Sequence, residues 1–565
     1  MQDDLTIAQA AKLRPVTEIA EEVGILPEEL ELYGPYKAKI TLSLLDRLAE
    51  RPNAKYILVT AINPTPLGEG KTVTTIGLTM ALRHLGHKAI TTLREPSMGP
   101  VFGIKGGACG GGFAQVVPME DINLHFTGDI HAVASANNLL AAMIDASIWH
   151  DNPLNLDPLN VTWRRVVDLN DVALRNIVTG LGGKRGGVPR QTGYDIAVAS
   201  EVMAILALTS GYADLRARLG RIWAGFTRAG EPVTADMLRA AGAMAVLMRD
   251  AVKPNLVQAL DGGPAFVHAG PFANIAIGTN SILADLMACK LGDYVVTEAG
   301  FGADCGAEKF LDIKCRTSGL APSAVVIVAT VKALKMHGGA FKMPPGRKPP
   351  MDEIQKPNAE AVAIGAANLA KHIENMNAFG IPAVVAINVF PYDTPEEIEV
   401  IRQKALEAGA FAVEESRVHG DAGAGGADLA RAVLRACEQP SQLKFVYDLD
   451  WPIRRKIEAI ATQVYGADGV DFAPAAERRI AQYEAGGLAG LPICMAKTQY
   501  SLTHDPALLG RPTGFRIPIR DILPAVGAGF LYPLLGEMST MPALPTDPAA
   551  AKMDIDDNGL MSGLF

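Results

Sequence analysis

The chain has 565 residues, of which 49% are hydrophobic and 20% are charged, and its formal net charge is −9. This balance excludes a disordered chain, and an acidic protein without a long basic run gives no reason to expect nucleic acid as a partner. Its six cysteines form no C-x-x-C pair, which argues against a structural zinc site or a disulfide framework. No apolar stretch reaches the roughly 20 residues that a membrane helix needs, and residues 1–4 do not resemble a signal peptide. We therefore expect a cytoplasmic protein with reduced thiols and no membrane partner, built from about three or four domains.

Residues 1–54 are polar and are predicted to form a helical lead-in to the first strand. A short apolar run rich in β-favouring residues follows at 56–61, which is typical of a buried parallel strand. A glycine-rich turn, a helix over 72–85 and a strand over 88–93 complete a βαβ unit. Further apolar runs follow along the chain, at 264–269, 293–297, 324–331 and 381–389.

These alternating elements predict an α/β fold, namely a P-loop NTPase-like, doubly wound, mostly parallel sheet with two smaller α/β or α+β domains toward the C-terminus. We expect a nucleotide-binding domain over 1–365, an α/β domain over 366–455 and a smaller mixed domain over 456–565. The glycine-rich run 420–426 is interpreted as a flexible break between segments, and the stretch 514–519 as one of the shorter C-terminal strands.

A phosphate-binding loop is predicted between the first strand and its helix. Its residues are Thr65, Pro66, Leu67, Gly68, Glu69, Gly70, Lys71 and Thr72. They match G-x-x-x-x-G-K-[ST] except that Thr65 takes the first glycine position. Glycines let backbone N–H groups wrap a phosphate, a lysine reaches the β and γ oxygens, and a hydroxyl holds Mg²⁺. An ordinary glycine turn is the alternative, but the flanking strand and helix favour a nucleotide site.

The next strand ends in Arg94, Glu95, Pro96 and Ser97, which in a parallel sheet lie on the same edge as the phosphate loop. Arg94 could stabilise charge on a transferring phosphoryl group, or it could be an ion-paired loop residue. The glycine-rich segment 103–112 is not expected inside a helix or strand; it is a loop that approaches a ligand or a disordered linker.

Asp121, His125 and Asp129 follow at a spacing of four, with His131 close by. On one helix they would share a face, which raises the possibility of a metal site. A polar face without a permanent metal is the interpretation that we favour.

The order of these motifs resembles the formate–tetrahydrofolate ligase family. The resemblance rests on the phosphate loop, on Arg94-Glu95-Pro96-Ser97, on Lys105-Gly106-Gly107 and on residues 119–132. Further matching stretches follow in the same order, at 297–304, 312–316, 335–339, 388–391, 496–501 and 559–565.

The resemblance implies ATP-dependent joining of formate to tetrahydrofolate through formyl phosphate, in a homotetramer. It implies that Lys71 and Thr72 hold Mg-ATP and that Arg94 cradles the transferring phosphoryl group. Glu95 is then an acidic residue near that site, with a possible link to a monovalent cation. The folate-side residues that it implies are Asp129, Phe301, Phe390, Pro391 and His419, with 366–455 contributing to the folate pocket.

The chain departs from the family pattern where an aromatic residue, often Trp, normally precedes a glycine-rich stretch and stacks on the pterin. His419 stands at that position, and Ala422 replaces the first glycine. A milder departure is Val73, where the family continues its threonine run. Two other functions stay compatible with a phosphate loop alone: a nucleotide-dependent ATPase switch, and a ligase for another small carboxylate.

Overall fold

The computed structural model describes residues 3–104, 109–343 and 349–564. Within them, twelve strands form one sheet in the order β1-β2-β14-β15-β4-β16-β3-β17-β18-β19, with β6 beside β14 and β5 beside β6. The strands are β1 Leu30–Leu32, β2 Ala38–Ile40, β3 Lys55–Ala61, β4 Ala89–Leu93, β5 Gly110–Gly111, β6 Ala114–Val117, β14 Asn255–Ala259, β15 Pro264–Val267, β16 Tyr294–Glu298, β17 Ala324–Ala329, β18 Ala383–Asn388 and β19 Ala412–Ser416.

Neighbouring strands run parallel from β15 to β19, and the opposite end of the sheet is antiparallel. The protein is therefore a mixed α/β protein with a large, mostly parallel sheet, as predicted. The apolar runs predicted as strands correspond to β3, β4 and β15 to β18, and the predicted helix after the loop is α4, Lys71–His84. In the parallel part, carboxyl ends meet at one edge.

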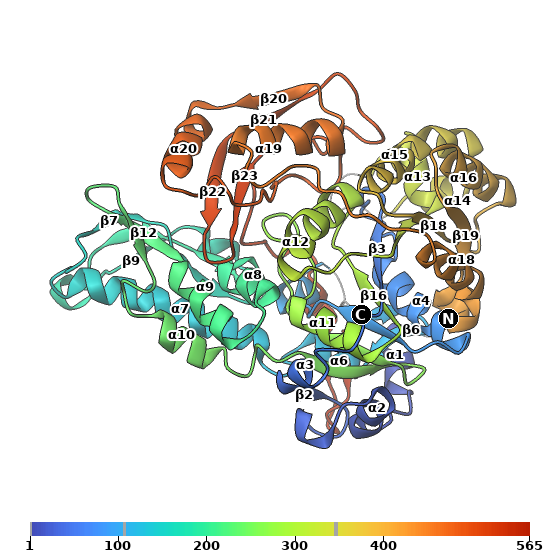
Figure 1. Cartoon of the computed structure of the whole chain (residues 1–565), viewed down its shortest axis with the longest axis horizontal. Coiled ribbons are helices and arrows are strands. Elements are labelled where there is room, and N and C mark those ends of the chain that lie inside the picture. Colours follow the sequence, from blue (N-terminus) through green and yellow to red (C-terminus); the bar gives the residue numbers. More distant parts are fainter. Residues whose placement is uncertain (1–2, 105–108, 344–348, 565) are drawn as a thin grey trace.

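Helices cover both faces of the parallel strands, as Figure 1 shows. Leu58 of β3 packs on the side of α11 (Ile282–Leu291) and α15 (Ala359–Ala378), whereas Ile57 and Val59 pack on the side of α4 and α18 (Ala427–Cys437). Because successive side chains of a strand point to opposite faces, a strand buried on both faces is mostly apolar along its whole length. This explains the continuous apolar runs in the sequence.

The N-terminal lead-in is helical only in part. Helices α1 (Asp4–Gln9), α2 (Val16–Val23) and α3 (Ser43–Arg47) accompany the strands β1 and β2. Ala38 and Ile40 of β2 are fully buried, and β2 pairs with β14, so this segment extends the main sheet. The prediction of a helical lead-in is thus correct for α1, α2 and α3 and wrong at β1 and β2, because burial of these alternating apolar residues favours a strand.

The segment from α7 to α10 forms a lobe at one side of the molecule, with an apolar core around Leu140, Ile205 and Leu215 (Figure 1). Its helices are α7 Asp129–Trp149, α8 Glu201–Leu208, α9 Tyr212–Arg221 and α10 Ala241–Leu247. Its strands are β7 Leu156–Val161, β8 Arg165–Val167, β9 Ile177–Thr179, β10 Arg190–Thr192, β11 Tyr194–Ile196, β12 Trp223–Thr227 and β13 Pro232–Thr234.

The C-terminal part forms a further layer, drawn in orange and red in Figure 1, with a separate apolar core around Ile457, Tyr483 and Leu531. Its elements are α19 Ile453–Ala459, α20 Pro474–Ala485, β20 Gly469–Phe472, β21 Arg516–Ile519, β22 Asp521–Ala525 and β23 Phe530–Leu534. The predicted strand at 514–519 corresponds to β21. The remaining elements are α5 Met98–Phe102, α6 Met119–Asn123, α12 Arg316–Ser318, α13 Val331–His337, α14 Met351–Gln355, α16 Pro395–Glu407, α17 Val418–Asp421, β24 Asp554–Ile555 and β25 Met561–Ser562.

The segment 420–426 is not a flexible linker. It belongs to α17 and to the 3-10 helix Ala422–Gly426, which pack on α4. A Cβ on Gly423 would lie 2.7 Å from the carbonyl oxygen of Met80, and one on Gly426 would lie 2.8 Å from a methyl group of Val418. The glycines therefore permit close packing of backbone against a helix, and the prediction of flexibility is wrong.

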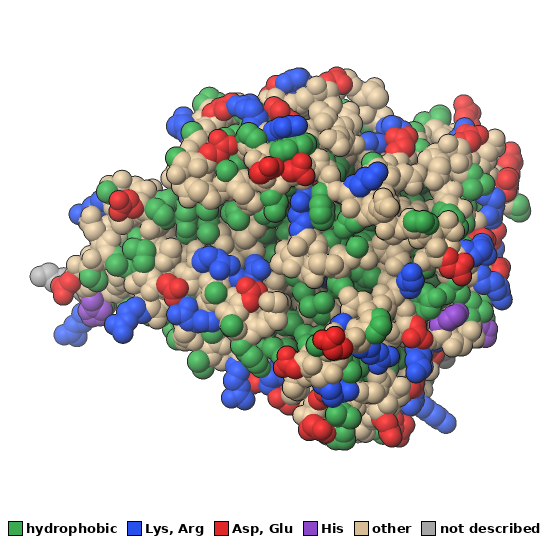
Figure 2. All heavy atoms as spheres, in the orientation of Figure 1, with side chains coloured by type: hydrophobic (Ala, Val, Ile, Leu, Met, Phe, Trp, Pro, Cys, Tyr) green, Lys and Arg blue, Asp and Glu red, His purple; other side chains and the backbone are tan. Residues whose placement is uncertain are grey.

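Acidic and basic side chains are interspersed on the face shown in Figure 2. None of the described helices combines the length and the apolar character that crossing a membrane requires.

Candidate active site

The predicted phosphate loop connects the carboxyl end of β3 to the first turn of α4. Gly68 and Gly70 have φ angles of 71° and 81°, in the left-handed region that favours glycine. A Cβ on Gly70 would also lie 2.4 Å from Nδ2 of Asn388. Both glycines are thus required by the backbone, and the helix that begins at Lys71 directs its first unpaired N–H groups toward the loop.

The carboxylate of Glu69 closes the loop on itself. Its Oε1 accepts hydrogen bonds from the backbone N–H of Thr65 (2.7 Å) and from the Thr65 hydroxyl (3.0 Å). Its Oε2 lies 4.0 Å from Nζ of Lys71, and Asn388 donates from Nδ2 to the Glu69 carbonyl oxygen over 3.1 Å. These contacts hold the beginning and the end of the loop in a defined shape, beside the lysine.

The carboxylate of Glu298, the last residue of β16, joins the loop to the neighbouring strand β4. Thr72 donates from Oγ1 to Glu298 Oε2 over 2.9 Å, and Nη2 of Arg94 lies 3.4 Å from Glu298 Oε1. The side chain of Glu298 is 6% exposed and that of Arg94 is 28% exposed. Strand order explains this convergence, because β16 lies between β3 and β4 and all three end at the same edge.

Two adjacent residues at this edge carry buried polar atoms without a hydrogen-bond partner in the described part of the chain. They are Nε of Arg94 and Oε2 of Glu95. Because an unsatisfied buried polar atom costs roughly 1–3 kcal/mol, two of them on adjacent residues call for an explanation, and a ligand bound at this edge would provide one.

Glu95 belongs to a buried cluster with Asp129 and Lys39. Nζ of Lys39 lies 2.7 Å from Oδ1 of Asp129, and Asn255 donates to Oδ2 of Asp129 over 2.8 Å. Burial, and then the Asp129 carboxylate, raise the pKa of Glu95 well above its ordinary value, while Lys39 opposes the shift. Two carboxyl groups thus share one ammonium group, and the second negative charge has no counter-ion within this cluster.

The spacing of Asp121, His125 and Asp129 does not reflect a single helical face. Helix α6 ends at Asn123 and α7 begins at Asp129, so the three residues lie on two helices and the turn between them. Asp121 pairs with Lys37 at 2.8 Å. Across the described ranges, no group of three His, Cys, Asp or Glu side chains has the geometry to hold a metal ion.

Phe301 lies in a strained turn next to Arg94. Its φ is 63°, which is unusual for a bulky residue. A Cβ on the preceding Gly300 would lie 2.9 Å from Nη1 of Arg94, so the guanidinium group packs directly on this turn.

The second glycine-rich loop is described only in part, because residues 105–108 lie outside the described ranges. Its end forms the short strand β5, paired with β6.

Phe390 and Pro391 follow β18 after one intervening residue, at the same edge of the sheet. The ring of Phe390 stacks on Tyr392, with centroids 5.6 Å apart and planes inclined by 16°. Nζ of Lys332 lies 4.0 Å from the centroid of the Phe390 ring.

His419 follows β19, the neighbour of β18, and its side chain is exposed. Its carbonyl oxygen accepts the N–H of Phe113 over 2.9 Å, and a Cβ on Gly112 would lie 2.8 Å from the imidazole ring. Nearby, Ala422 has a φ of 48°, a conformation that favours the glycine it replaces.

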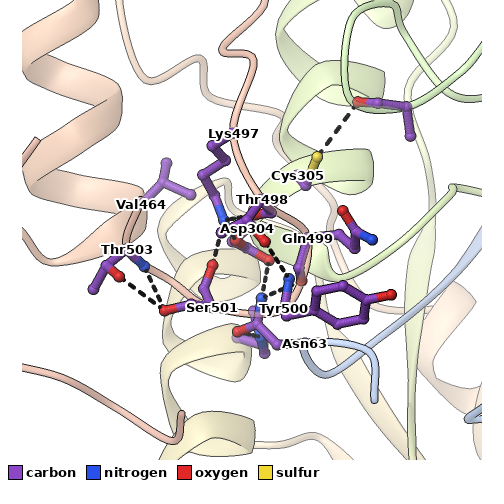
Figure 3. A network of polar contacts seen from close by, with 12 residues as sticks. Asn63, Asp304, Cys305, Val464, Lys497, Thr498, Gln499, Tyr500, Ser501 and Thr503 are labelled. Atoms are coloured by element: carbon purple, nitrogen blue, oxygen red, sulfur yellow. Dashed lines mark hydrogen bonds and ion pairs between the residues drawn. The ribbon is translucent and has the colours of Figure 1, made fainter. Parts of the chain in front are cut away.

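A buried polar network holds the chain just before the phosphate loop (Figure 3). Asn63 donates from Nδ2 to Oδ1 of Asp304 (3.0 Å) and to the carbonyl oxygen of Gln499 (3.3 Å). Asp304 Oδ2 lies 2.7 Å from Nζ of Lys497, and both side chains are fully buried. His337 donates to the Asn63 carbonyl oxygen over 2.9 Å. The network connects the loop to α13 and to the C-terminal segment around Lys497.

Sequence reasoning missed three residues of this arrangement. Glu298 could have been found as an acid at the carboxyl end of an apolar strand. Lys332 and Asn63 carry no comparable signal, because their contacts involve backbone carbonyls and distant side chains.

The site combines a loop that contains two left-handed glycines, a lysine at the start of a helix, and a hydroxyl beside the carboxylate at the end of a strand. This combination is typical of an α/β enzyme with a nucleotide-binding site. Comparison with known proteins gives the family. The family model described as formate--tetrahydrofolate ligase matches residues 2–565, so the chain belongs to the formate–tetrahydrofolate ligase family. The family uses ATP and tetrahydrofolate as substrates, and the activity is the joining of formate to tetrahydrofolate.

Similar proteins named formate--tetrahydrofolate ligase cover this chain completely. The one from Roseiflexus castenholzii (strain DSM 13941 / HLO8) is 58% identical over 565 residues, which is 100% of both chains. The one from Desulforamulus reducens (strain ATCC BAA-1160 / DSM 100696 / MI-1) is 58% identical over 562 residues, covering 100% of this chain and 99% of the relative. The one from Symbiobacterium thermophilum (strain DSM 24528 / JCM 14929 / IAM 14863 / T) is 54% identical over 566 residues.

Proposed function

We propose that the reaction takes place at the edge of the sheet where β3, β4 and β16 end, and that it proceeds through formyl phosphate. The observation that carries this proposal is the convergence of Thr72 and Arg94 on the carboxylate of Glu298. This carboxylate joins the predicted nucleotide loop to the guanidinium group of Arg94, which can contact a transferring phosphoryl group.

The triphosphate of ATP is assigned to the loop Thr65–Thr72. Lys71 and the first N–H groups of α4 offset the charge of the phosphates. The hydroxyl of Thr72 and the carboxylate of Glu298 are hard oxygen donors that fit Mg²⁺ bound with ATP. Such an ion would neutralise charge on the phosphate oxygens.

Formate is assigned to the neighbourhood of Arg94. A formate oxygen attacks the γ-phosphorus, the bond to the β-phosphate oxygen breaks, and ADP leaves. The guanidinium group stabilises the negative charge of the transition state, and afterwards that of the formyl phosphate. The unpartnered Nε of Arg94 supports this role.

Tetrahydrofolate is assigned to the side formed by Phe390, Pro391 and His419, with Phe301 and Asp129 toward the formyl group. A folate nitrogen attacks the formyl carbon, phosphate leaves, and the nitrogen loses its proton. Because formyl phosphate hydrolyses readily, water must be kept away, and we assign this task to the Phe301 turn and the loop 103–112. The Asp129 side chain is buried and paired with Lys39, so its contact with this side of the site includes the neighbouring Glu95.

We also propose a monovalent cation beside Glu95, whose buried Oε2 has no partner in the described chain.

For the whole molecule, we propose a P-loop NTPase-like, doubly wound fold with domains 1–365, 366–455 and 456–565, and a homotetramer. A cytoplasmic location is supported by six cysteines that are buried and unpaired.

The experiment uses formate labelled with ¹⁸O in both oxygens, together with Mg-ATP and tetrahydrofolate. The proposal expects one ¹⁸O atom in the released phosphate for each formyl group transferred, because a formate oxygen becomes a phosphate oxygen. Phosphate without ¹⁸O would overturn the formyl phosphate step. Nucleotide hydrolysis without any need for formate would instead favour the ATPase switch.

A further inference from the structure

Lys332 occupies a position between the two halves of the proposed site. It lies in the first turn of α13, directly after β17. Strand β17 pairs with β3, which leads to the phosphate loop, and with β18, which leads to Phe390. A side chain at this point of the sheet edge can therefore reach both segments.

The ammonium group of Lys332 contacts both segments at once. Nζ donates to the carbonyl oxygen of Leu67 over 3.2 Å and lies 4.0 Å from the centroid of the Phe390 ring. Within the described residues it forms no ion pair. Burial lowers the pKa of Lys332, and the carboxylates of Glu69 and Asp393 oppose this shift without touching the ammonium group. A partly buried cation without a counter-ion is well suited to meet an anionic ligand.

A second contact connects the same two segments. The side chain of Leu67 packs in a small apolar cluster with Met336 and Phe341, and Tyr392 packs against the same cluster. Tyr392 in turn stacks on Phe390. Leu67 and Phe390 are thus connected by two chains of contacts, one through Lys332 and one through the cluster and Tyr392.

We infer that Lys332 is a positioning residue that couples nucleotide binding to folate binding. This inference rests on the proposed function, in which Phe390 forms a wall of the folate pocket. Before ATP binds, the ammonium group of Lys332 covers the face of the Phe390 ring in a cation–π contact. The triphosphate attracts Nζ toward the loop, and the ring becomes available to the pterin. ATP therefore strengthens folate binding, and folate strengthens ATP binding by the same factor.

The test measures the dissociation constant of tetrahydrofolate with and without Mg²⁺ and a non-hydrolysable ATP analogue, in the absence of formate. For the unmodified protein we expect the nucleotide to lower this constant by about fivefold or more. For Lys332→Met, which keeps an unbranched side chain only one atom shorter but removes the charge, we expect a ratio within about twofold of one. Lys404→Met is the matched control, because Lys404 is a half-exposed residue of α16 paired with Glu407.

An unchanged coupling ratio in Lys332→Met, or a ratio of one in the unmodified protein, overturns the inference. A purely structural role of Lys332 would change both affinities and leave the ratio as it is. If Lys332→Met does not fold, Lys332→Gln gives the same comparison. Phe390→Ala separates the two proposals: loss of folate binding with retained nucleotide binding supports the folate wall, and unchanged folate binding overturns that wall and the inference with it.

Discussion

Thr72 and Glu298 are 226 positions apart in the sequence, and the hydroxyl of Thr72 donates to the Glu298 carboxylate over 2.9 Å. The pair joins the first turn of α4 to the end of the neighbouring strand β16. Arg94 lies close to the other oxygen of the same carboxylate, so one acidic residue connects the predicted phosphate loop to Arg94.

Replacement of Glu298 by glutamine tests this relationship. We expect kcat to fall by about tenfold to a hundredfold, because a hydrogen bond to a charged group contributes roughly 1.5–3 kcal/mol. The concentration of Mg²⁺ at half-maximal rate should rise as well. Steady-state rates over a Mg²⁺ series measure both effects. Glu374→Gln, at an exposed pair with Arg511, serves as the control and should behave like the unmodified protein.

Arg94→Ala is expected to leave ATP binding largely intact and to lower kcat by a factor of about 10²–10³, as for the loss of one transition-state contact. Equilibrium binding of ATP and steady-state turnover give the two quantities. A defect confined to the KM for tetrahydrofolate would contradict the assignment of Arg94 to the phosphoryl group.

His419→Trp addresses the departure from the family pattern. The imidazole ring borders Gly112 on one side and is otherwise exposed, so there is space for a larger ring. We expect a lower KM for tetrahydrofolate, since stacking of an aromatic side chain on a nucleobase-like ring contributes about 1–3 kcal/mol. An unchanged KM would place residue 419 outside the folate pocket.

Ala422→Gly should stabilise the protein. Ala422 has a φ of 48° and a ψ of −141°, which glycine adopts without strain. Relief of this strain is expected to raise the free energy of unfolding by about 1 kcal/mol. Denaturant unfolding measures the change. Ala424→Gly in the same turn, where φ is not positive, should have the opposite sign because glycine only adds flexibility to the unfolded chain.

The buried pair of Asp304 and Lys497 gives a prediction about stability. Lys497→Met leaves the Asp304 carboxylate uncompensated, which should lower the free energy of unfolding by about 3–5 kcal/mol. The double variant with Asp304→Asn should recover part of this loss, because no buried charge is left. A double variant that is less stable than the sum of the two single changes would show that the pair is not the main interaction of this network.

The sequence by itself determined the mostly parallel sheet, the phosphate loop and the family. Apolar runs bounded by turn residues predict β3, β4 and β15 to β18, because a strand buried on both faces is mostly apolar along its whole length. Likewise, Gly68, Gly70 and Lys71 are recognisable because the backbone conformation and the phosphate chemistry act within a few residues.

Only the tertiary structure decided which distant side chains meet. The hydrogen bond of Thr72 to Glu298 follows from the insertion of β16 between β3 and β4, and no local pattern encodes that strand order. The compact turn at 420–426 was misread as flexible because its glycines serve close packing against α4, which depends on a neighbour in space. The contacts of Lys332 with the Leu67 carbonyl and the Phe390 ring have the same origin: they arise from strands that become neighbours only when the sheet forms.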